Sequence, residues 1–228
     1  MNDIVRVPTG IPGFDRLIEG GLLKGSINLV VGGAGTCKTT FCSQYLWNGL
    51  QAGETGVYIT LEQEAEHILS DMARYGFNFQ QFIDQGTFVI LDEMPSSFKD
   101  LEKAAFDAII KLGAKRFALD SLTVAIMGLK EIKDMSALRR DVFTFTKRLR
   151  NMGVTSLLSC EIPETKPKAL ARFGFEEFVA DGIIILHYLE YATDSKTRSL
   201  IIRKMRRTDH GTDLYPFVIT KNGIIVKS

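Results

Sequence analysis

Residues Gly32–Thr39 read GGAGTCKT, directly after an apolar run at Ile27–Val31 and directly before a helical pattern over Lys38–Leu50. The order of strand, glycine-rich loop and helix is the context that the phosphate-binding pattern G-x-x-x-x-G-K-[ST] requires. In such a loop, backbone N–H groups turn towards phosphate oxygens, and the helix N-terminus adds partial positive charge. The sequence therefore predicts a nucleotide-binding loop at the end of a strand.

Two side chains at the end of this loop carry specific chemistry. In such loops the lysine, here Lys38, reaches the terminal phosphates, and the hydroxyl of Thr39 is a ligand for Mg²⁺. We therefore expect ATP and Mg²⁺ as ligands, with Lys38 a candidate catalytic residue as well. The candidate nucleotide-binding residues are Gly32, Gly33, Ala34, Gly35, Thr36, Cys37, Lys38, Thr39 and Thr40.

Cys37 stands where the pattern has its second glycine. Glycine lets the backbone approach the phosphate closely, so a Cβ and a sulfur atom require a shift of loop or ligand. A thiol at a helix N-terminus beside Lys38 is also expected to have a lowered pKa, and its oxidation would block the site. Two alternatives stay open: a tolerated small residue whose Cβ points away from the ligand, and a degenerate loop that binds nucleotide weakly or not at all.

Two carboxylates follow apolar strands that are expected near this loop. Asp120 ends the run Arg116–Asp120 (RFALD), the position at which nucleotide-binding proteins of this kind hold magnesium. Thr39 and Asp120 are therefore the candidate metal ligands. Glu62 follows the strand expected over Val57–Leu61 and is the candidate base for the attacking water. The alternative for Glu62 is a solvated glutamate at a helix N-terminus.

Strand and helix patterns alternate through the first two thirds of the chain. The other predicted helices are Glu64–Tyr75, Leu101–Leu112 and Met135–Met152, and the other predicted strands are Phe88–Leu91 and Val154–Ser159. This βα repetition predicts an α/β fold whose mostly parallel sheet is covered by helices on both faces, with the ligand site at one sheet edge.

After Cys160 the pattern changes. Strands are expected at Phe178–Tyr188, Thr197–Met205, Pro216–Thr220 and Ile224–Val226, with no helix between them. Lys221-Asn222-Gly223 is a suitable hairpin turn between the last two strands. We interpret this part as an antiparallel extension of the main sheet, and residues 1–228 as a single domain.

Composition narrows the class of protein. The 228 residues are 45% hydrophobic and 24% charged, with a formal net charge of +1. Such a balance argues against a protein that coats nucleic acid. The three cysteines form no CxxC pair, which is typical of a reduced, intracellular protein. No segment approaches the ~20 apolar residues of a membrane span and no secretory signal is visible, so the expected location is the cytoplasm.

Binding of single-stranded nucleic acid is an alternative role. Lys166, Lys168 and Arg172 lie on an expected loop over Glu161–Arg172. The same loop also carries acidic residues and offers little aromatic surface on which bases could stack. The sequence therefore does not favour nucleic acid as the partner.

Three segments resemble the KaiC family of ATPases, in the same order along the chain. They are TGIPGFDRLIEGGLLKGS at Thr9–Ser26, FGFEEFVADGIIIL at Phe173–Leu186, and KMRRTDH followed by YPFVIT within Lys204–Thr220. The resemblance covers essentially the whole chain and corresponds to one KaiC repeat instead of the tandem pair. It implies a RecA-like P-loop ATPase core that binds nucleotide between the subunits of a homo-oligomer, often a hexameric ring.

The resemblance also implies roles for individual residues. Glu62 matches the first of two adjacent catalytic glutamates, whereas Gln63 replaces the second, which puts full hydrolytic competence in doubt. Lys204, Arg206 and His210 match residues that reach across the interface to the neighbour's nucleotide. Lys204 and Arg206 are two apart on an expected strand and therefore share one face. Without the resemblance, this strand would be interpreted as a solvated basic edge.

These observations predict an Mg²⁺-dependent, slow ATPase that binds ATP and ADP and works as a ring-forming motor or molecular switch. The first alternative is a regulatory nucleotide-binding module that does not hydrolyse ATP. The second is a recombinase paralogue that binds single-stranded DNA. Cys37 and Gln63 favour the regulatory module. The residues that favour the enzyme are Lys38, Thr39, Asp120 and Glu62.

Overall fold

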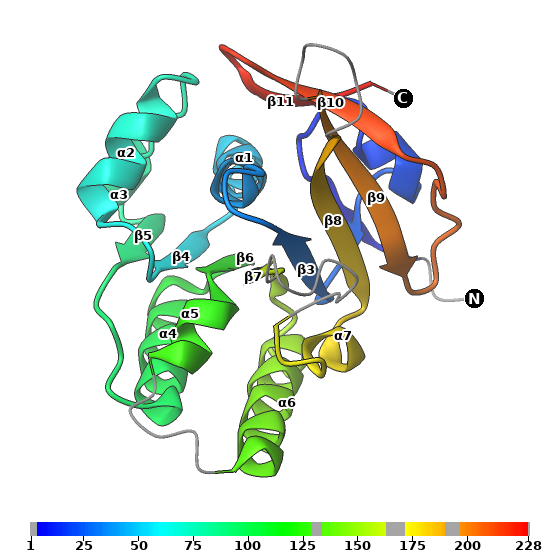
Figure 1. The fold of residues 1–228 in the computed structure, drawn as a ribbon. Coiled ribbons are helices and arrows are strands. Elements are labelled where there is room, and N and C mark those ends of the chain that lie inside the picture. Colours follow the sequence, from blue (N-terminus) through cyan, green and yellow to red (C-terminus); the bar gives the residue numbers. More distant parts are fainter. Residues whose placement is uncertain (1–3, 129–133, 163–171, 190–196, 228) are drawn as a thin grey trace.

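A computed structural model describes residues 4–128, 134–162, 172–189 and 197–227 (Figure 1). The described residues form a nine-stranded sheet in the order β11-β10-β9-β8-β3-β7-β6-β4-β5 and a small sheet of β1 and β2. The strands are β1 (Arg6–Val7), β2 (Leu22–Leu23), β3 (Ile27–Gly32), β4 (Gly56–Thr60), β5 (Phe88–Leu91), β6 (Arg116–Asp120), β7 (Thr155–Glu161), β8 (Gly182–Leu189), β9 (Thr197–Met205), β10 (Tyr215–Thr220) and β11 (Gly223–Val226).

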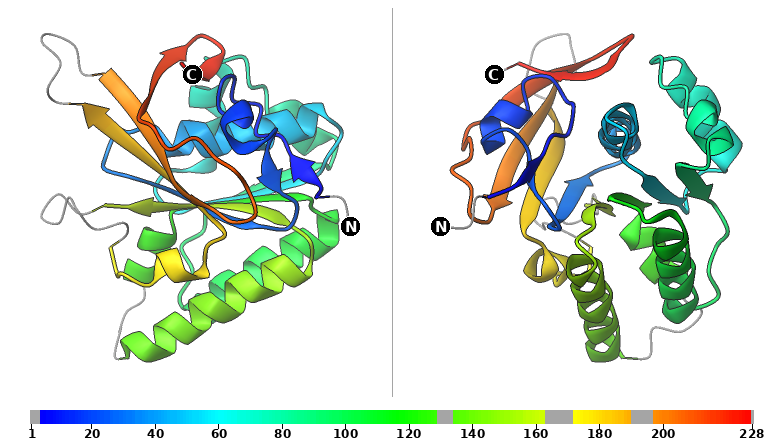
Figure 2. Two further views of the ribbon diagram at one scale, coloured as in Figure 1. Left: turned by 90° about the vertical axis from the view of Figure 1, so that its right-hand side faces the viewer. Right: turned by 180° about the vertical axis from the view of Figure 1, so that it is seen from behind.

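The strands from β8 to β5 are parallel, and β9, β10 and β11 continue the sheet in antiparallel order. Helices cover both faces of the sheet (Figures 1 and 2). They are α1 (Lys38–Gln51), α2 (Ala65–Ala73), α3 (Gln80–Asp84), α4 (Phe98–Leu112), α5 (Leu122–Met127), α6 (Met135–Asn151) and α7 (Glu176–Val179), with a 3₁₀ turn at Asp15–Ile18. The predicted fold class is confirmed.

Strand β3 lies at the centre of the sheet and carries the loop of interest at its end. All six of its residues are buried, as expected for an apolar strand covered on both faces. On one face, α1 contributes buried side chains such as Phe41 and Tyr45 to one core. On the other face, α6 contributes Phe145 and Leu149 to a second core with α4 and α5. The two cores hold β3 and α1 firmly on either side of the loop.

Helix capping explains where several elements begin. α4 begins at Phe98, three residues before the predicted start, because Ser97 accepts a hydrogen bond from the backbone N–H of Asp100. α4 ends at Leu112 and is capped by Gly113, whose φ of 61° is the left-handed conformation that favours glycine. α5 was not predicted; its N-terminus is capped by Ser121, which accepts from Val124 N.

The predicted strand over Phe178–Tyr188 begins too early, whereas no helix separates the four C-terminal strands in the described residues, as predicted. Residues Glu176–Val179 form α7, and β8 begins only at Gly182. The buried carboxylate of Glu176 accepts hydrogen bonds from the backbone N–H groups of Phe173 (3.2 Å) and Phe175 (3.0 Å). These bonds satisfy backbone donors in the residues that lead into α7.

A buried arginine joins the N-terminal segment to the sheet. Arg116, only 2% exposed, forms an ion pair with Glu54 and donates to the carbonyl oxygens of Pro8 (2.9 Å) and Tyr45 (2.7 Å). Its guanidinium also lies over the ring of Tyr45, 4.6 Å from the centroid. Arg116 therefore connects β6 and α1 to the N-terminal segment at Pro8.

Candidate nucleotide-binding site

The loop Gly32–Thr39 lies at the edge where the parallel strands end, between β3 and α1 (Figure 1). Lys38 is buried, and its Nζ donates to the carbonyl oxygens of Gly32 (3.2 Å) and Gly33 (3.0 Å). The hydroxyl of Thr36 also donates to Gly33 O, at 2.9 Å. The ammonium group of Lys38 therefore lies against the carbonyl oxygens of its own loop.

Cys37 directly precedes α1 and has a left-handed backbone, with φ 77° and ψ 32°. This conformation is ordinary for glycine but costs a residue with a Cβ roughly 1–2 kcal/mol. The Sγ atom lies 3.6 Å from the carbonyl oxygen of Gly35. The position thus has the backbone of the pattern's glycine, although the side chain is that of cysteine.

The expectation of a lowered thiol pKa at Cys37 is wrong. Burial raises the pKa of Cys37, and this effect exceeds the opposing influence of Arg198 and Lys38. Desolvation disfavours the thiolate more than the two neighbouring cations favour it. A raised pKa favours the neutral thiol over the thiolate.

Thr39 and Asp120 lie face to face beside the loop. The hydroxyl of Thr39 donates to Oδ2 of Asp120 at 2.6 Å, and the hydroxyl of Tyr58 donates to the same oxygen at 3.1 Å. The hydroxyl of Ser159 donates to the other oxygen, Oδ1. Three hydroxyls, from α1, β4 and β7, therefore fix the orientation of a carboxylate that is only 1% exposed.

The donor set at Thr39 and Asp120 fits a magnesium ion. Hydroxyl and carboxylate oxygens are the ligands that Mg²⁺ prefers, and at phosphate sites it takes further ligands from phosphates and water. Among the described residues, no group of three or more His, Cys, Asp or Glu side chains gathers into a metal site of its own.

Glu62 lies next to this pair, just beyond the end of β4. Thr60 is paired with Asp120 in the parallel register, and the backbone N–H of Leu61 donates to Asp120 O at 2.7 Å. Partial burial raises the pKa of Glu62; the Asp120 charge adds to this rise, while the Ser121 hydroxyl and Lys38 oppose it. A raised pKa suits a carboxylate that accepts a proton near neutral pH.

Tyr188 and Arg198 also contact the loop, although the sequence did not point to them. The Tyr188 hydroxyl donates to Gly35 O at 2.6 Å, and Arg198 donates to that hydroxyl at 3.2 Å. The Arg198 guanidinium also lies 5.1 Å from the centroid of the Tyr188 ring. The two residues are directly opposite in the β8–β9 register, which no motif could have indicated.

Lys204 and Arg206 lie at the opposite end of the sheet from the loop of their own chain. In the register, Met205 is opposite Gly182, and Gly182 is opposite Asn28 near the start of β3. At about 3.3 Å per residue, Asn28 and Gly32 are separated by about 13 Å along the strand. The structure therefore does not bring Lys204 and Arg206 to their own phosphate loop.

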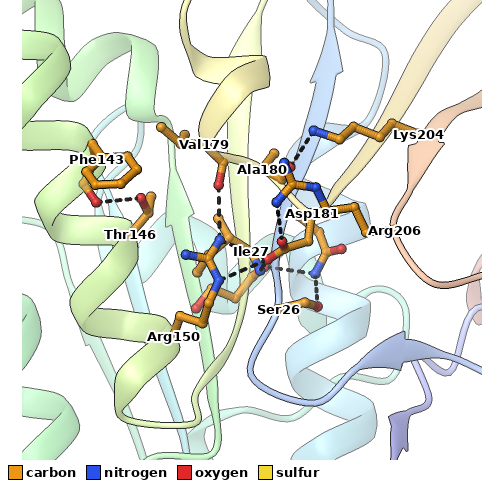
Figure 3. Close-up of polar contacts among 12 residues, drawn as sticks. Ser26, Ile27, Phe143, Thr146, Arg150, Val179, Ala180, Asp181, Lys204 and Arg206 are labelled. Atoms are coloured by element: carbon orange, nitrogen blue, oxygen red, sulfur yellow. Dashed lines mark hydrogen bonds and ion pairs between the residues drawn. The ribbon is translucent and has the colours of Figure 1, made fainter. Parts of the chain in front are cut away.

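These two cations contact the junction between α7 and β8 instead (Figure 3). Lys204 Nζ donates to the carbonyl oxygens of Glu177 (3.2 Å) and Ala180 (2.7 Å), and Arg206 forms an ion pair with Asp181 at 3.3 Å. The third predicted interface residue, His210, lies between β9 and β10, with Nδ1 3.0 Å from Gly211 O.

The structure also bears on the expected basic loop and on the expected absence of a membrane span. Lys166 and Lys168, predicted to lie on a loop, fall outside the described residues, whereas Arg172 is described and exposed. Over the described parts of the chain, no helix has both the length and the apolar character needed to cross a bilayer.

The mostly parallel sheet, the sequence GGAGTCKT between β3 and α1, and the aspartate at the end of β6 define a protein of the RecA-like P-loop class. A family model described as the ATPase KaiC matches residues 7–228. The chain therefore belongs to the KaiC family, and the resemblance inferred from the sequence is confirmed.

Individual relatives agree with this assignment. Circadian clock protein KaiC3 of Synechocystis is 35% identical over 235 residues, which cover 98% of this chain and 46% of KaiC3. A UPF0273 protein of Aeropyrum pernix is 36% identical, covering 97% of this chain and 93% of that protein. The crystal structure of a KaiC-like protein from Pyrococcus horikoshii matches with a TM-score of 0.90 and 36% identity, covering 99% of this chain and 100% of that one. The chain thus spans about half the length of the KaiC relatives.

Proposed function

We propose that this protein is an Mg²⁺-dependent, slow ATPase that works as a ring-forming motor or switch, with each nucleotide bound between two subunits. The observation that carries this proposal is the position of Lys204 and Arg206, at the end of the sheet opposite their own loop. Lys204 lies in β9 and Arg206 in the turn that directly follows it, not on one strand face as the sequence suggested, and both contact the short segment Glu177–Asp181. A neighbouring subunit is the partner whose loop they would meet.

One subunit would supply the binding half of the site. ATP would replace the carbonyl oxygens of Gly32 and Gly33 as partners of Lys38, and the loop's backbone N–H groups would hold the phosphates. Thr39 and Asp120 would hold the magnesium ion, which neutralises phosphate charge when bound.

Glu62 would supply the base for hydrolysis. Its carboxylate lies at the same sheet edge as Asp120 and Lys38, and burial raises its pKa towards neutrality. Such a group can accept a proton from the attacking water. Lys204, Arg206 and His210 of the neighbouring subunit would stabilise the negative charge that develops on the phosphoryl group.

A regulatory module that binds nucleotide without hydrolysis is the second candidate. The left-handed backbone of Cys37 favours it, because a Cβ stands where glycine allows close approach of the phosphate. Gln63, in place of a second catalytic glutamate, points in the same direction. Phosphate release by the purified protein separates the two candidates.

The shared site is tested by mixing two inactive variants. Arg206→Ala keeps its own Glu62, and Glu62→Gln keeps its own Arg206, so a mixed ring contains some complete sites. We expect partial recovery of phosphate release on mixing, in oligomers sized by light scattering with MgATP. No recovery in a sample shown to form mixed oligomers would count against a site shared between subunits.

A further inference from the structure

Asp181 is the residue at which Arg206 is fixed to the rest of the protein (Figure 3). Its Oδ1 accepts from Arg206 NH1 at 3.3 Å, and its backbone carbonyl accepts from the Arg206 N–H at 2.9 Å. Both the side chain and the backbone of Arg206 are therefore tied to one residue. Asp181 itself is only 14% exposed, whereas Arg206 is 54% exposed.

The other carboxylate oxygen of Asp181, Oδ2, binds residues of β3 and α6. Oδ2 accepts from the backbone N–H of Ile27 at 3.0 Å and from two nitrogens of Arg150, at 3.0 and 3.3 Å. The backbone N–H of Asp181 also donates to Ile27 O, at 2.7 Å. Arg150 belongs to α6 and Ile27 begins β3, so the carboxylate is held by two rigid elements.

Arg206 can bind Asp181 and a phosphate at the same time. A guanidinium group has five N–H donors in a planar fork. Among the described residues, only its NH1 has a side-chain partner, which leaves the remaining donors available on an exposed group. The carboxylate therefore orients Arg206 and leaves other N–H donors of its guanidinium group available for a phosphate.

Lys204 depends on the same junction. Its ammonium group donates to the carbonyl oxygens of Glu177 and Ala180, just before Asp181. The proposed interface cations thus rest on one short segment, Glu177–Asp181, and Asp181 is the only side chain of that segment that binds either of them in the described structure.

We propose that Asp181 is a positioning residue for the neighbour's active site, holding Arg206 in the orientation in which it meets the adjacent subunit's triphosphate. This inference rests on the proposed function, because it assumes that Arg206 acts across the interface. A long exposed side chain loses considerable rotamer freedom when it is fixed. The carboxylate restricts that freedom before the nucleotide arrives, so binding loses less entropy.

The variant Asp181→Asn tests the proposal. The amide oxygen, in the place of Oδ2, can still accept from Ile27 N–H and Arg150, whereas the carboxylate charge that faces both Arg206 and Arg150 is lost. We expect kcat for ATP to fall about 3–10-fold, on the scale of the side-chain entropy of one arginine, with unchanged affinity for ATP at the variant's own loop. Asp107→Asn on α4, an exposed position away from the site, is the matched control for loss of charge and should leave kcat unchanged.

Mixing experiments separate positioning from a structural defect. Asp181→Asn should recover turnover when it is mixed with Glu62→Gln, because the latter supplies an intact Asp181 and Arg206. It should not recover when mixed with Arg206→Ala. Recovery with neither partner, or weakened ATP binding at its own loop, would overturn the proposal in favour of a structural role.

The variant Arg206→Ala distinguishes a failure of the positioning role from a failure of the shared site. If Arg206→Ala loses turnover and Asp181→Asn does not, the positioning role is wrong while the shared site stands. If Arg206→Ala turns over at the wild-type rate, the shared site is wrong and Asp181 has nothing to position. Thermal melting of each variant, compared with Asp107→Asn, shows that the fold is intact.

Discussion

Thr39 and Asp120 are 81 residues apart in the sequence, yet the hydroxyl of one donates to the carboxylate of the other at 2.6 Å. The contact forms because β6 ends beside the first turn of α1, at the same sheet edge as the phosphate loop. A magnesium ion that arrives with nucleotide would find a hydroxyl and a carboxylate already side by side.

Asp120→Asn should therefore weaken nucleotide binding only when magnesium is present. Removal of a carboxylate that orients or indirectly holds a metal typically costs about 10–100-fold in metal affinity. Titrations of ATP with Mg²⁺ and with excess EDTA give the comparison. Equal losses under both conditions would mean that Asp120 supports the fold and not the metal.

Cys37→Gly should stabilise the protein by about 1 kcal/mol, because glycine adopts a φ of 77° without the clash of a Cβ. We also expect tighter ATP binding, by about the same amount, since the loop backbone can approach the phosphates more closely. Urea unfolding and calorimetry measure the two effects.

Cys37→Ala is the matched control for this change. It removes the sulfur atom but keeps the Cβ and the left-handed strain, so it should not produce the gain. If alanine and glycine stabilise the protein equally, the strain at Cys37 is not the cause.

Glu62→Gln should keep ATP binding and lose about 10²–10⁴-fold in turnover, the usual range for a general base. The same variant should be more stable than wild type at pH 7. Because burial raises the pKa of Glu62 in the folded state, its ionised form opposes folding above the ordinary pKa of glutamate.

The sign of this effect sets its pH dependence. As pH rises from about 4.3, the ordinary glutamate value, through the raised pKa of the folded state, wild type loses stability relative to the glutamine variant. The unfolding free energies of wild type and Glu62→Gln should therefore differ at pH 7 and converge at pH 4. A constant difference across this range would mean that Glu62 does not titrate as described.

Arg116→Ala should cost at least about 3 kcal/mol of unfolding free energy, because it leaves a cavity and the unpaired carbonyl oxygens of Pro8 and Tyr45. Lys115→Ala, an exposed neighbour in sequence, should change stability by no more than about 0.5 kcal/mol. Similar values for both variants would show that Arg116 does not join the elements as its contacts indicate.

The sequence predicted those features that depend on local pattern. The loop and β3 were found because a glycine-rich turn between a strand and a helix has a specific signature. The parallel sheet followed from the alternation of strands and helices. Asp120 was expected near the loop because it ends an apolar strand, and its hydrogen bond with Thr39 confirms that position.

Features that depend on tertiary contacts were missed. The fold brings Tyr188 and Arg198 to the loop through the antiparallel register, which has no sequence signature. The start of β8 was wrong because Glu176–Val179 form a short helix, and buried Glu176 accepts hydrogen bonds from the backbone N–H groups of Phe173 and Phe175. The thiol pKa of Cys37 was wrong because the effect of a helix N-terminus was considered without burial.

Lys38→Ala tests most directly whether the chain binds ATP at Gly32–Thr39. Calorimetric titration of ATP into the folded variant should show no binding, because Lys38 is the lysine of the phosphate-binding pattern and lies within the loop. Lys111→Ala, at an exposed position on α4, is the matched control and should bind ATP like wild type. Wild-type affinity in a folded Lys38→Ala protein would contradict the claim.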